Sequence, residues 1–353
     1  MKSLYKRDRK ESDTRDMKSL YKRDRKESDT RDMKSLYKRD RKESDTRDMK
    51  SLYKRDRKES DTRDMKSLTD DRMRKVAVVT GANRGIGLAI VRQLCKQFSG
   101  DVYLTSRMSD NGKKAIERLK QEGLNPIFHE LDVSQPDSIR MFEEFIIERY
   151  GGIDILINNA GVSFGKDKVP VFRQAQLCYE VDFMGTLNMC KIFLPLIRPH
   201  GRIVNLTNSY IGKKSALGEH AQNKLDVSTM SLSDLWLVMD FYIKASKTGT
   251  HANGGWPESP KQMTKTLIVA MTKILSRDLK GDPRKNILIN ACCPGWTDTD
   301  GSVEFRDGVC KDTVLQSADQ AASGVVWVAS IRPGQSSPNG EVVQKKEIIS
   351  CDF

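Results

Sequence analysis

Short apolar runs alternate with amphipathic stretches between residues 75 and 343, and this alternation predicts strands and helices in turn. The runs are apolar at nearly every position rather than at every second one, which is typical of strands buried on both faces. We therefore expect an α/β fold with a doubly wound parallel sheet of about seven strands and helices on both faces. The predicted strands are residues 75–79, 101–106, 127–131, 153–158, 202–207, 286–292 and 341–343.

The stretches between these runs carry apolar residues at helical spacing. Ser134 stands before one of them and is expected to cap its first turn. Residues 209–255, approximately, have no regular place in the alternation and are interpreted as an insertion. The predicted helices are residues 86–98, 113–122, 135–150, 173–197, 261–279 and 319–329.

The first 64 residues are four identical copies of a sixteen-residue unit, and a fifth copy begins at Met65 and stops after Leu68. Ten of the sixteen positions are charged, so the segment cannot bury enough apolar surface to offset the entropy of ordering it. We expect residues 1–68 to be a disordered tandem-repeat tail and residues 73–353 to form the folded domain. The tail holds 25 Lys and Arg against 16 Asp and Glu, and the rest of the chain 36 against 32, so the net charge of +13 describes mainly the tail.

The repeats have two interpretations. A functional tail would bind nucleic acid or another polyanion. Acidic residues are interleaved with the basic ones, however, and no aromatic stacking array accompanies them. Since every copy also opens with Met, a duplicated segment without a nucleic-acid partner is the favoured interpretation.

Composition and residue spacing argue against a membrane-spanning protein, a secreted protein and a metalloprotein. We find no apolar run long enough to span a bilayer and no signal peptide at the start of the chain. Seven cysteines without paired spacing fit the reducing cytoplasm. The four histidines are scattered without ligand spacing, so we expect no metal site.

A glycine-rich turn follows the first predicted strand and reads Thr-Gly-Ala-Asn-Arg-Gly-Ile-Gly over residues 80–87. Glycines at this junction let the backbone approach a pyrophosphate, while the helix behind them directs free N–H groups at it. The pattern therefore predicts a Rossmann-type dinucleotide site. Its expected cofactor contacts are Gly81, Asn83, Arg84, Gly85, Ile86 and Gly87.

Further motifs stand at the ends of later strands, where ligands of such a sheet bind. Asp132 follows the third strand, Asn158, Ala160 and Gly161 follow the fourth, and Pro294, Gly295 and Thr299 follow the sixth. Each alone resembles an ordinary turn. Their order along the chain favours a single cofactor site at one edge of the sheet.

The charge after the second strand indicates which dinucleotide binds. A site for NAD usually carries a carboxylate there, to hydrogen-bond the ribose 2′-hydroxyl. This chain has Thr105, Ser106 and Arg107 instead, and Arg84 lies inside the glycine loop. Two guanidinium groups can clamp a 2′-phosphate, so the expected cofactor is NADP(H).

Residues 76–353 resemble the monomeric carbonyl reductase branch of the short-chain dehydrogenase/reductases. The similar segments are residues 85–92 (GIGLAIVR), 98–102 (FSGDV), 150–154 (YGGID), 255–257 (GWP) and 290–296 (NACCPGW). The resemblance implies that Asp132 contacts the adenine, Asn158 and Gly161 the ribose side, and Thr299 the nicotinamide arm. It also implies a monomer, because in the family the insertion lies over the surface that other members use to oligomerise.

The chemistry implied is hydride transfer from the nicotinamide to an aldehyde, ketone or quinone carbonyl. In the family a Tyr supplies the proton, and a Lys four residues on lowers its pKa and holds the nicotinamide ribose. A Ser donates to the carbonyl oxygen and an Asn supports a proton relay. The matching positions of this chain are Asp182 for the Asn, Asn208 for the Ser, Lys261 for the Tyr and Lys265 for the Lys.

Three of these four positions are substituted, so we expect impaired turnover with cofactor binding retained; the alternative is an inactive NADPH-binding protein that acts as a sensor or interaction module. Lys261 and Lys265 should repel each other and lower each other's pKa, unless Asp182 pairs with one of them. Tyr210 is a weaker candidate for a substitute proton donor. Ser209, Trp256 and Trp296 are the candidate walls of a substrate pocket.

Overall fold

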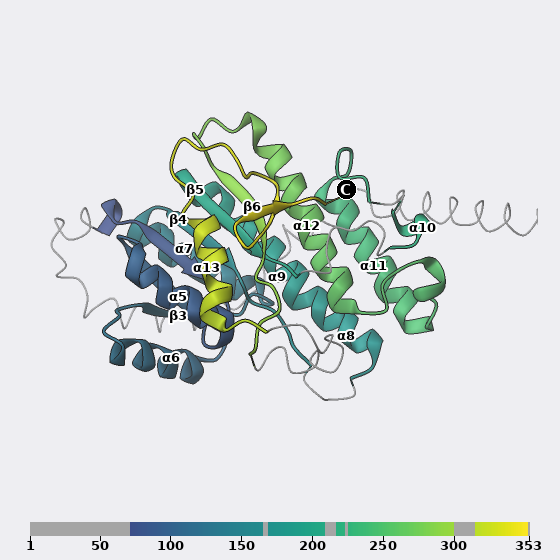
Figure 1. Ribbon diagram of the computed structural model, residues 1–353, viewed down its shortest axis with the longest axis horizontal. Coiled ribbons are helices and arrows are strands. Elements are labelled where there is room, and N and C mark those ends of the chain that lie inside the picture. The colour runs from purple at the N-terminus through teal and green to yellow at the C-terminus, as the bar shows by residue number, and fades with distance from the viewer. Residues whose placement is uncertain (1–70, 165–168, 209–216, 223–224, 300–314, 352–353) are drawn as a thin grey trace, which may run out of the picture. The chain divides into compact units, whose positions relative to one another are not determined.

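The chain divides into two units, residues 1–66 and 67–353. The computed structural model describes residues 71–164, 169–208, 217–222, 225–299 and 315–351, all of them in the second unit (Figure 1). The tail expected over residues 1–68 lies outside the described residues.

One sheet of eight strands organises the described part of the second unit, in the order β3-β2-β1-β4-β5-β6-β7-β8. Strands β1 to β7 pair in parallel, and β8 pairs with β7 antiparallel. The doubly wound parallel sheet is confirmed; the short eighth strand was not predicted. The strands are β1 (Val76–Val79), β2 (Asp101–Ser106), β3 (Ile127–Glu130), β4 (Ile153–Asn158), β5 (Ile197–Leu206), β6 (Leu288–Cys293), β7 (Val342–Gln344) and β8 (Glu347–Ile349).

Helices cover both faces of the sheet because its strands are apolar on both sides. In β1, Val76 and Val78 pack into one core and Ala77 and Val79 into the other. The second of these cores includes buried side chains of α5 (Gly85–Gln97), α6 (Ser109–Gln121) and α13 (Ala318–Ala329). The first core includes those of α7 (Pro136–Tyr150), α9 (Gly185–Phe193), α11 (Leu232–Thr248) and α12 (Pro260–Asp278).

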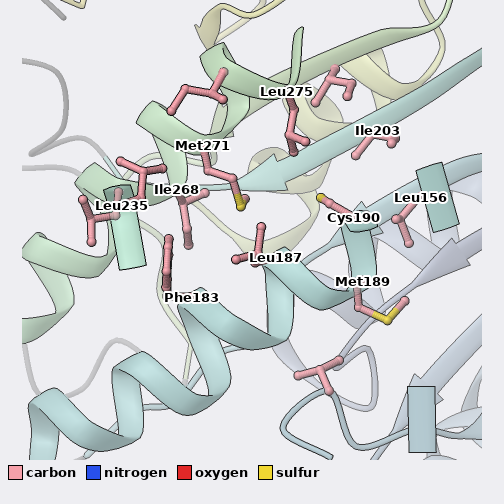
Figure 2. Close-up of a cluster of buried hydrophobic side chains, with 14 of the residues drawn as sticks. Leu156, Phe183, Leu187, Met189, Cys190, Ile203, Leu235, Ile268, Met271 and Leu275 are labelled. Atoms are coloured by element: carbon pink, nitrogen blue, oxygen red, sulfur yellow. The ribbon is translucent and has the colours of Figure 1, made fainter. Parts of the chain in front are cut away.

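Figure 2 shows the middle of the first core. Leu156 of β4 and Ile203 of β5 lie near Leu187 and Cys190 of α9, and Ile268 of α12 closes the cluster. All of these side chains are almost fully buried. Their burial fixes α12 against the sheet, and α12 carries both lysines of the expected catalytic set.

The helix predicted over residues 173–197 is a chain of four shorter segments. It consists of α8 (Val171–Leu177), a π-helix η1 (Cys178–Met184), α9 and a 3-10 turn η2 (Leu194–Leu196). Pro195 lies in that last turn, where its missing N–H prevents a further α-helical bond. Ile197 therefore already belongs to β5, which begins five positions before the predicted start.

Ser134 does not cap α7, contrary to the prediction. Its hydroxyl and its backbone N–H both donate to Oδ1 of Asp132, at 2.7 and 2.9 Å. Gln135 takes the N-cap position without a side-chain hydrogen bond, and Pro136 opens the helix. The helix begins one residue later than predicted, so Ser134 stands before the N-cap position rather than at it.

The insertion contains a long helix that the sequence analysis did not assign. Ser231 and Asp234 form a capping box at the start of α11, with each side chain accepting from the other's backbone N–H. This S-x-x-D spacing before an apolar run was the available signal. The short elements α10 (Glu219–Gln222) and η4 (Ala252–Gly254) accompany it, and a 3-10 turn, η5 (Leu279–Gly281), follows α12 outside the insertion.

Candidate cofactor and catalytic site

A cavity of about 1160 Å³ lies at the carboxyl ends of the parallel strands. It runs from α6 and the end of β2 to the first turns of α12. Most residues predicted for the site line it together. They are Gly81, Asn83, Arg84, Gly85, Ile86, Gly87, Arg107, Asp132, Ala160, Gly161, Asn208, Lys261, Lys265, Pro294, Gly295, Trp296 and Thr299.

The turn between β1 and α5 is shaped for close approach of backbones. A Cβ on Gly81 would lie 2.8 Å from Cα of Ala160, and one on Gly87 would lie 2.4 Å from Nδ2 of Asn159. Gly85 has φ of 56° and Gly81 has φ of 60°, a region that L side chains rarely adopt. Only glycine fits these positions without displacing the neighbouring loop.

Helix α5 leaves its amino end available to an anion. Arg84 is the N-cap residue, and neither a side-chain cap nor an acidic residue in the first turn neutralises this end. The first N–H groups of a helix carry a partial positive charge. A phosphate group is the natural partner of such an uncapped glycine-rich end.

Asn159 braces the glycine turn, and the sequence analysis missed it. Its Nδ2 donates to the carbonyl oxygens of Thr80, at 2.9 Å, and Gly81, at 3.0 Å. In return Oγ1 of Thr80 accepts the N–H groups of Asn159 and Ala160, each at 3.0 Å. The loops after β1 and β4 are therefore tied into one rigid floor.

Asn158, predicted to contact the ribose, instead points into the core. Its Nδ2 donates to Oδ1 of Asn205 at 2.9 Å, beside the thiol of Cys190, and it does not line the cavity. Successive side chains of a strand point to opposite faces, so the last residue of β4 and its neighbour face different ways. Of the two asparagines of this motif, it is Asn159 that lines the cavity.

Basic side chains line the cavity near the end of β2. Arg107 and Arg84 line this end of the cavity, as predicted, and both are exposed. Lys114 and Arg118 of α6 line it too, although the sequence analysis did not identify them. Their i,i+4 spacing directly after the second strand was the signal that could have found them.

Asp132 is the single acidic residue among those found lining the cavity. Its Oδ1 accepts two hydrogen bonds from Ser134, and its backbone N–H donates to Oγ of Ser138 at 3.0 Å. A carboxylate satisfied in this way neutralises the four nearby cations only in part. This end of the cavity therefore favours an anionic ligand.

At the other end, Asp182 lies in the π-helix η1 with its side chain fully buried. Nζ of Lys261 is 2.6 Å from Oδ2 of Asp182 and 2.5 Å from the carbonyl oxygen of Val162. Oδ1 of Asp182 accepts the N–H of Val162 at 2.8 Å. Asp182 and Lys261 together therefore hold Val162 through both of its backbone polar groups.

Lys265 lies one helical turn after Lys261, and its Nζ is 3.7 Å from Oδ2 of Asp182. It donates to the carbonyl oxygen of Leu206 at 2.9 Å. Burial lowers the pKa of Lys265 to about 8; the nearby Asp182 carboxylate opposes this shift and the Lys261 ammonium adds to it. The carboxylate thus lies between two ammonium groups that would otherwise repel.

Asn208, the position that the resemblance assigns to the family Ser, lines the cavity, and its buried Oδ1 has no hydrogen-bond partner among the described residues. Trp296 lines the cavity as well. Trp256 does not, contrary to its proposed role as a pocket wall: it is 3% exposed and packs in the core 6.0 Å from the ring of Phe241. Ser209 and Tyr210 lie outside the described residues.

The loop after β6 closes the cavity against the glycine turn. Gly295 has φ of 79°, and Gln316 holds the loop by donating to the carbonyl oxygen of Pro294. Thr299 reaches the first loop, since a Cβ on Gly85 would lie 3.7 Å from its Cγ2. Two segments more than two hundred positions apart therefore share one wall.

Two other kinds of site were sought among the described residues. No helix there has both the length and the apolar character needed to cross a membrane. Nor does this part of the chain bring three or more His, Cys, Asp or Glu side chains together in an arrangement that could hold a metal ion.

Comparison with known proteins agrees with this geometry. The family model for short chain dehydrogenase matches residues 75–221. The chain is 39% identical over 278 residues to carbonyl reductase (NADPH) 1 of Rattus norvegicus, covering 78% of this chain and 98% of the relative. It is also 39% identical over 278 residues to carbonyl reductase (NADPH) 3 of Homo sapiens, covering 78% and 97%. Salutaridine reductase from Papaver somniferum matches with a TM-score of 0.66 and 26% identity, over 76% of this chain and 99% of that one. The chain therefore belongs to the short chain dehydrogenase family.

Proposed function

We propose that this protein is an NADPH-dependent oxidoreductase of the carbonyl reductase type, which reduces small aldehydes, ketones or quinones. The observation that carries the proposal is a single cavity with a cation-lined end at β2 and Lys265 at the other end. Relatives at 39% identity are carbonyl reductases whose names specify NADPH. The cofactor is NADP(H).

The described residues fit this cofactor. The glycine turn leaves no room for a Cβ at Gly81 or Gly87, and α5 offers an uncapped amino end for the pyrophosphate. Arg84 and Arg107 supply positive charge for the 2′-phosphate. When bound, NADPH supplies the hydride, and Lys265 would hold its nicotinamide ribose.

The chain's own residues must then bind the carbonyl and deliver a proton. The side-chain amide of Asn208 can donate an N–H to the carbonyl oxygen. Lys261 occupies the position of the family's proton donor, but its ammonium is held by Asp182 and Val162. Moving a proton from Lys261 would leave the buried carboxylate facing a neutral amine. We therefore propose that turnover is impaired.

The same clamp supports a second candidate, a protein that binds NADPH without turning it over and acts as a sensor or interaction module. In that case the Asp182–Lys261 pair is a structural replacement for the neutral Asn and Tyr of the family. Both candidates share the cofactor end of the cavity. They differ only in whether Lys261 can donate a proton to a carbonyl substrate.

A turnover assay separates them. Protein starting at Met65 would be titrated with NADPH by fluorescence and then tested for NADPH oxidation with the quinone menadione. Turnover of roughly 1–10³ per second supports the reductase, whereas binding without turnover supports the second candidate. If neither NADPH nor NADH binds, both are wrong.

Three further properties belong to the proposal. We propose a monomer, since α11 of the insertion packs on α8 and α12 where the family's oligomer surface is expected; light scattering tests the mass.

We place the protein in the cytoplasm, because the six described cysteines are free thiols. We also propose that the repeats of residues 1–64 are dispensable for binding, which truncation to Met65 checks.

A further inference from the structure

One side of helix α6 faces the cofactor cavity. Asn111, Lys114, Ala115 and Arg118 all line it. Residues of an α-helix follow one another at about 100°, so these four share one side of the helix. Lys113 and Lys120 fall on the opposite side and do not line the cavity. The chain thus offers two pairs of cations on one helix, and only one pair points to the site.

The position of α6 is fixed by tight packing. A Cβ on Gly112 would lie 1.9 Å from Cε2 of Phe128, so the helix backbone lies directly against that ring on β3. Ala115, Ile116 and Leu119 are buried beneath the helix. A helix held this closely keeps the stems of Lys114 and Arg118 at the rim of the cavity.

The charge of Arg118 is only weakly compensated. Arg118 has Glu122 as an ion-pair partner at 4.0 Å. Glu122 pairs mainly with Arg92, whose Nε and Nη2 donate to it at 2.5 and 2.9 Å. For this reason most of the positive charge of Arg118 remains available to an anion in the cavity.

We propose that Lys114 and Arg118 are specificity-determining residues, forming a second tier of cations behind Arg84 and Arg107 that selects a 2′-phosphorylated adenosine. The inference rests on the proposed function, because it assumes that the adenosine end of the nucleotide lies beside β2. A phosphate dianion gains from every unscreened cation within a Debye length of about 10 Å. A bare ribose hydroxyl gains nothing from them.

Adenosine 2′,5′-bisphosphate and adenosine 5′-monophosphate are suitable probes, because neither carries a nicotinamide. Their affinities would be measured by calorimetry on the full chain and on the double variant Lys114→Gln/Arg118→Gln. The matched control is Lys113→Gln/Lys120→Gln, which removes two cations from the other side of the same helix. We expect the bisphosphate to bind the first variant about tenfold more weakly, and the monophosphate to change less than about threefold. The control should change neither by more than about twofold, and the effect of the first variant should shrink at 0.5 M salt.

Equal losses in the two double variants would overturn the inference, and so would a wild-type protein without preference for the bisphosphate. Circular dichroism of each variant excludes loss of fold as the cause. The proposed function fails differently: NADPH that binds but is never oxidised refutes the reductase and leaves the inference standing. A bisphosphate preference that survives in Lys114→Gln/Arg118→Gln refutes the inference and leaves the reductase standing.

Discussion

Nζ of Lys261 lies 2.6 Å from Oδ2 of Asp182, and we propose that this pair stands where the family carries an uncharged Tyr and Asn. Asp182 is fully buried, whereas the side chain of Lys261 is 17% exposed. A buried carboxylate needs a partner, so Asp182 depends on the Lys261 ammonium. This dependence makes the pair testable as a unit.

Lys261→Tyr alone should lower the free energy of unfolding by about 3 kcal/mol, because Asp182 is left buried without its nearest cation. Asp182→Asn should cost less, since the Lys261 ammonium can turn toward water. The double variant should recover most of the loss, giving a coupling of about 1–3 kcal/mol in urea unfolding. Additive losses would show that the pair is not coupled.

The same double variant should raise NADPH oxidation with menadione by about 10²-fold, because a Tyr at position 261 restores a proton donor beside Lys265. Lys261→Tyr alone should gain less, as the Asp182 carboxylate would repel a phenolate. Steady-state kinetics at saturating NADPH measure the change. No gain in the double variant would show that Asn208 limits the reaction.

The buried ammonium of Lys265 should make stability depend on pH. Its pKa is lowered from 10.5 to about 8, so the folded state disfavours the charged form. This penalty is fully present below pH 8 and is relieved as the pH rises toward 10.5, because the unfolded chain binds more protons in that window. The stability of wild type relative to Lys265→Met should therefore rise across this range. Urea midpoints of both proteins between pH 7 and pH 10 check it, and parallel curves would contradict it.

Arg107→Ala should weaken NADPH binding about tenfold and leave NADH binding unchanged, since only the 2′-phosphate needs the guanidinium. Fluorescence titration with each nucleotide measures the ratio. Arg332→Ala removes an exposed guanidinium that does not line the cavity and serves as the control. If the ratio is the same in both variants, Arg107 has no part in cofactor choice.

Two glycine-to-alanine changes should have opposite effects. Gly112→Ala meets the ring of Phe128 and should cost about 1–3 kcal/mol of stability through overpacking. Gly324→Ala lies inside α13 with nothing within 4 Å of the new Cβ, and should add about 0.5–1 kcal/mol through helix propensity. Thermal unfolding of the two variants compares them. A neutral Gly112→Ala would mean that α6 can shift away from β3 at no cost.

Much of the fold could be predicted because its signals are local. The apolar strands and the glycine turn at residues 80–87 carry their own pattern, and the structure has both. The π-helix around Asp182 could not be predicted, because its apolar spacing is close to that of an α-helix. Ser134 is not the cap because the helix starts at Pro136, which puts Gln135 at the N-cap position.

At the site, the order of the motifs indicated which loops line the cavity, but the sequence did not show which side chains point into it. The Asn-Asn-Ala-Gly motif was recognised, yet whether Asn158 or Asn159 faces the cavity depends on where β4 stops pleating. Trp256 follows Gly255 but turns into the core, where its ring packs against Phe241 of α11. Lys114 and Arg118 could not be predicted as site residues, because the sequence does not show which side of α6 faces the cavity.

The hairpin of β7 and β8 affects how readily the protein would associate with other chains at high concentration. Lys345 and Lys346 form its two-residue turn with φ of 50° and 69°, and β8 is only three residues long. An outermost strand with unpaired backbone groups invites another chain to stack onto it. Because β8 is short and two lysines adjoin it, this edge of the sheet is a poor template for a further strand. We therefore expect it to resist the growth of fibrils.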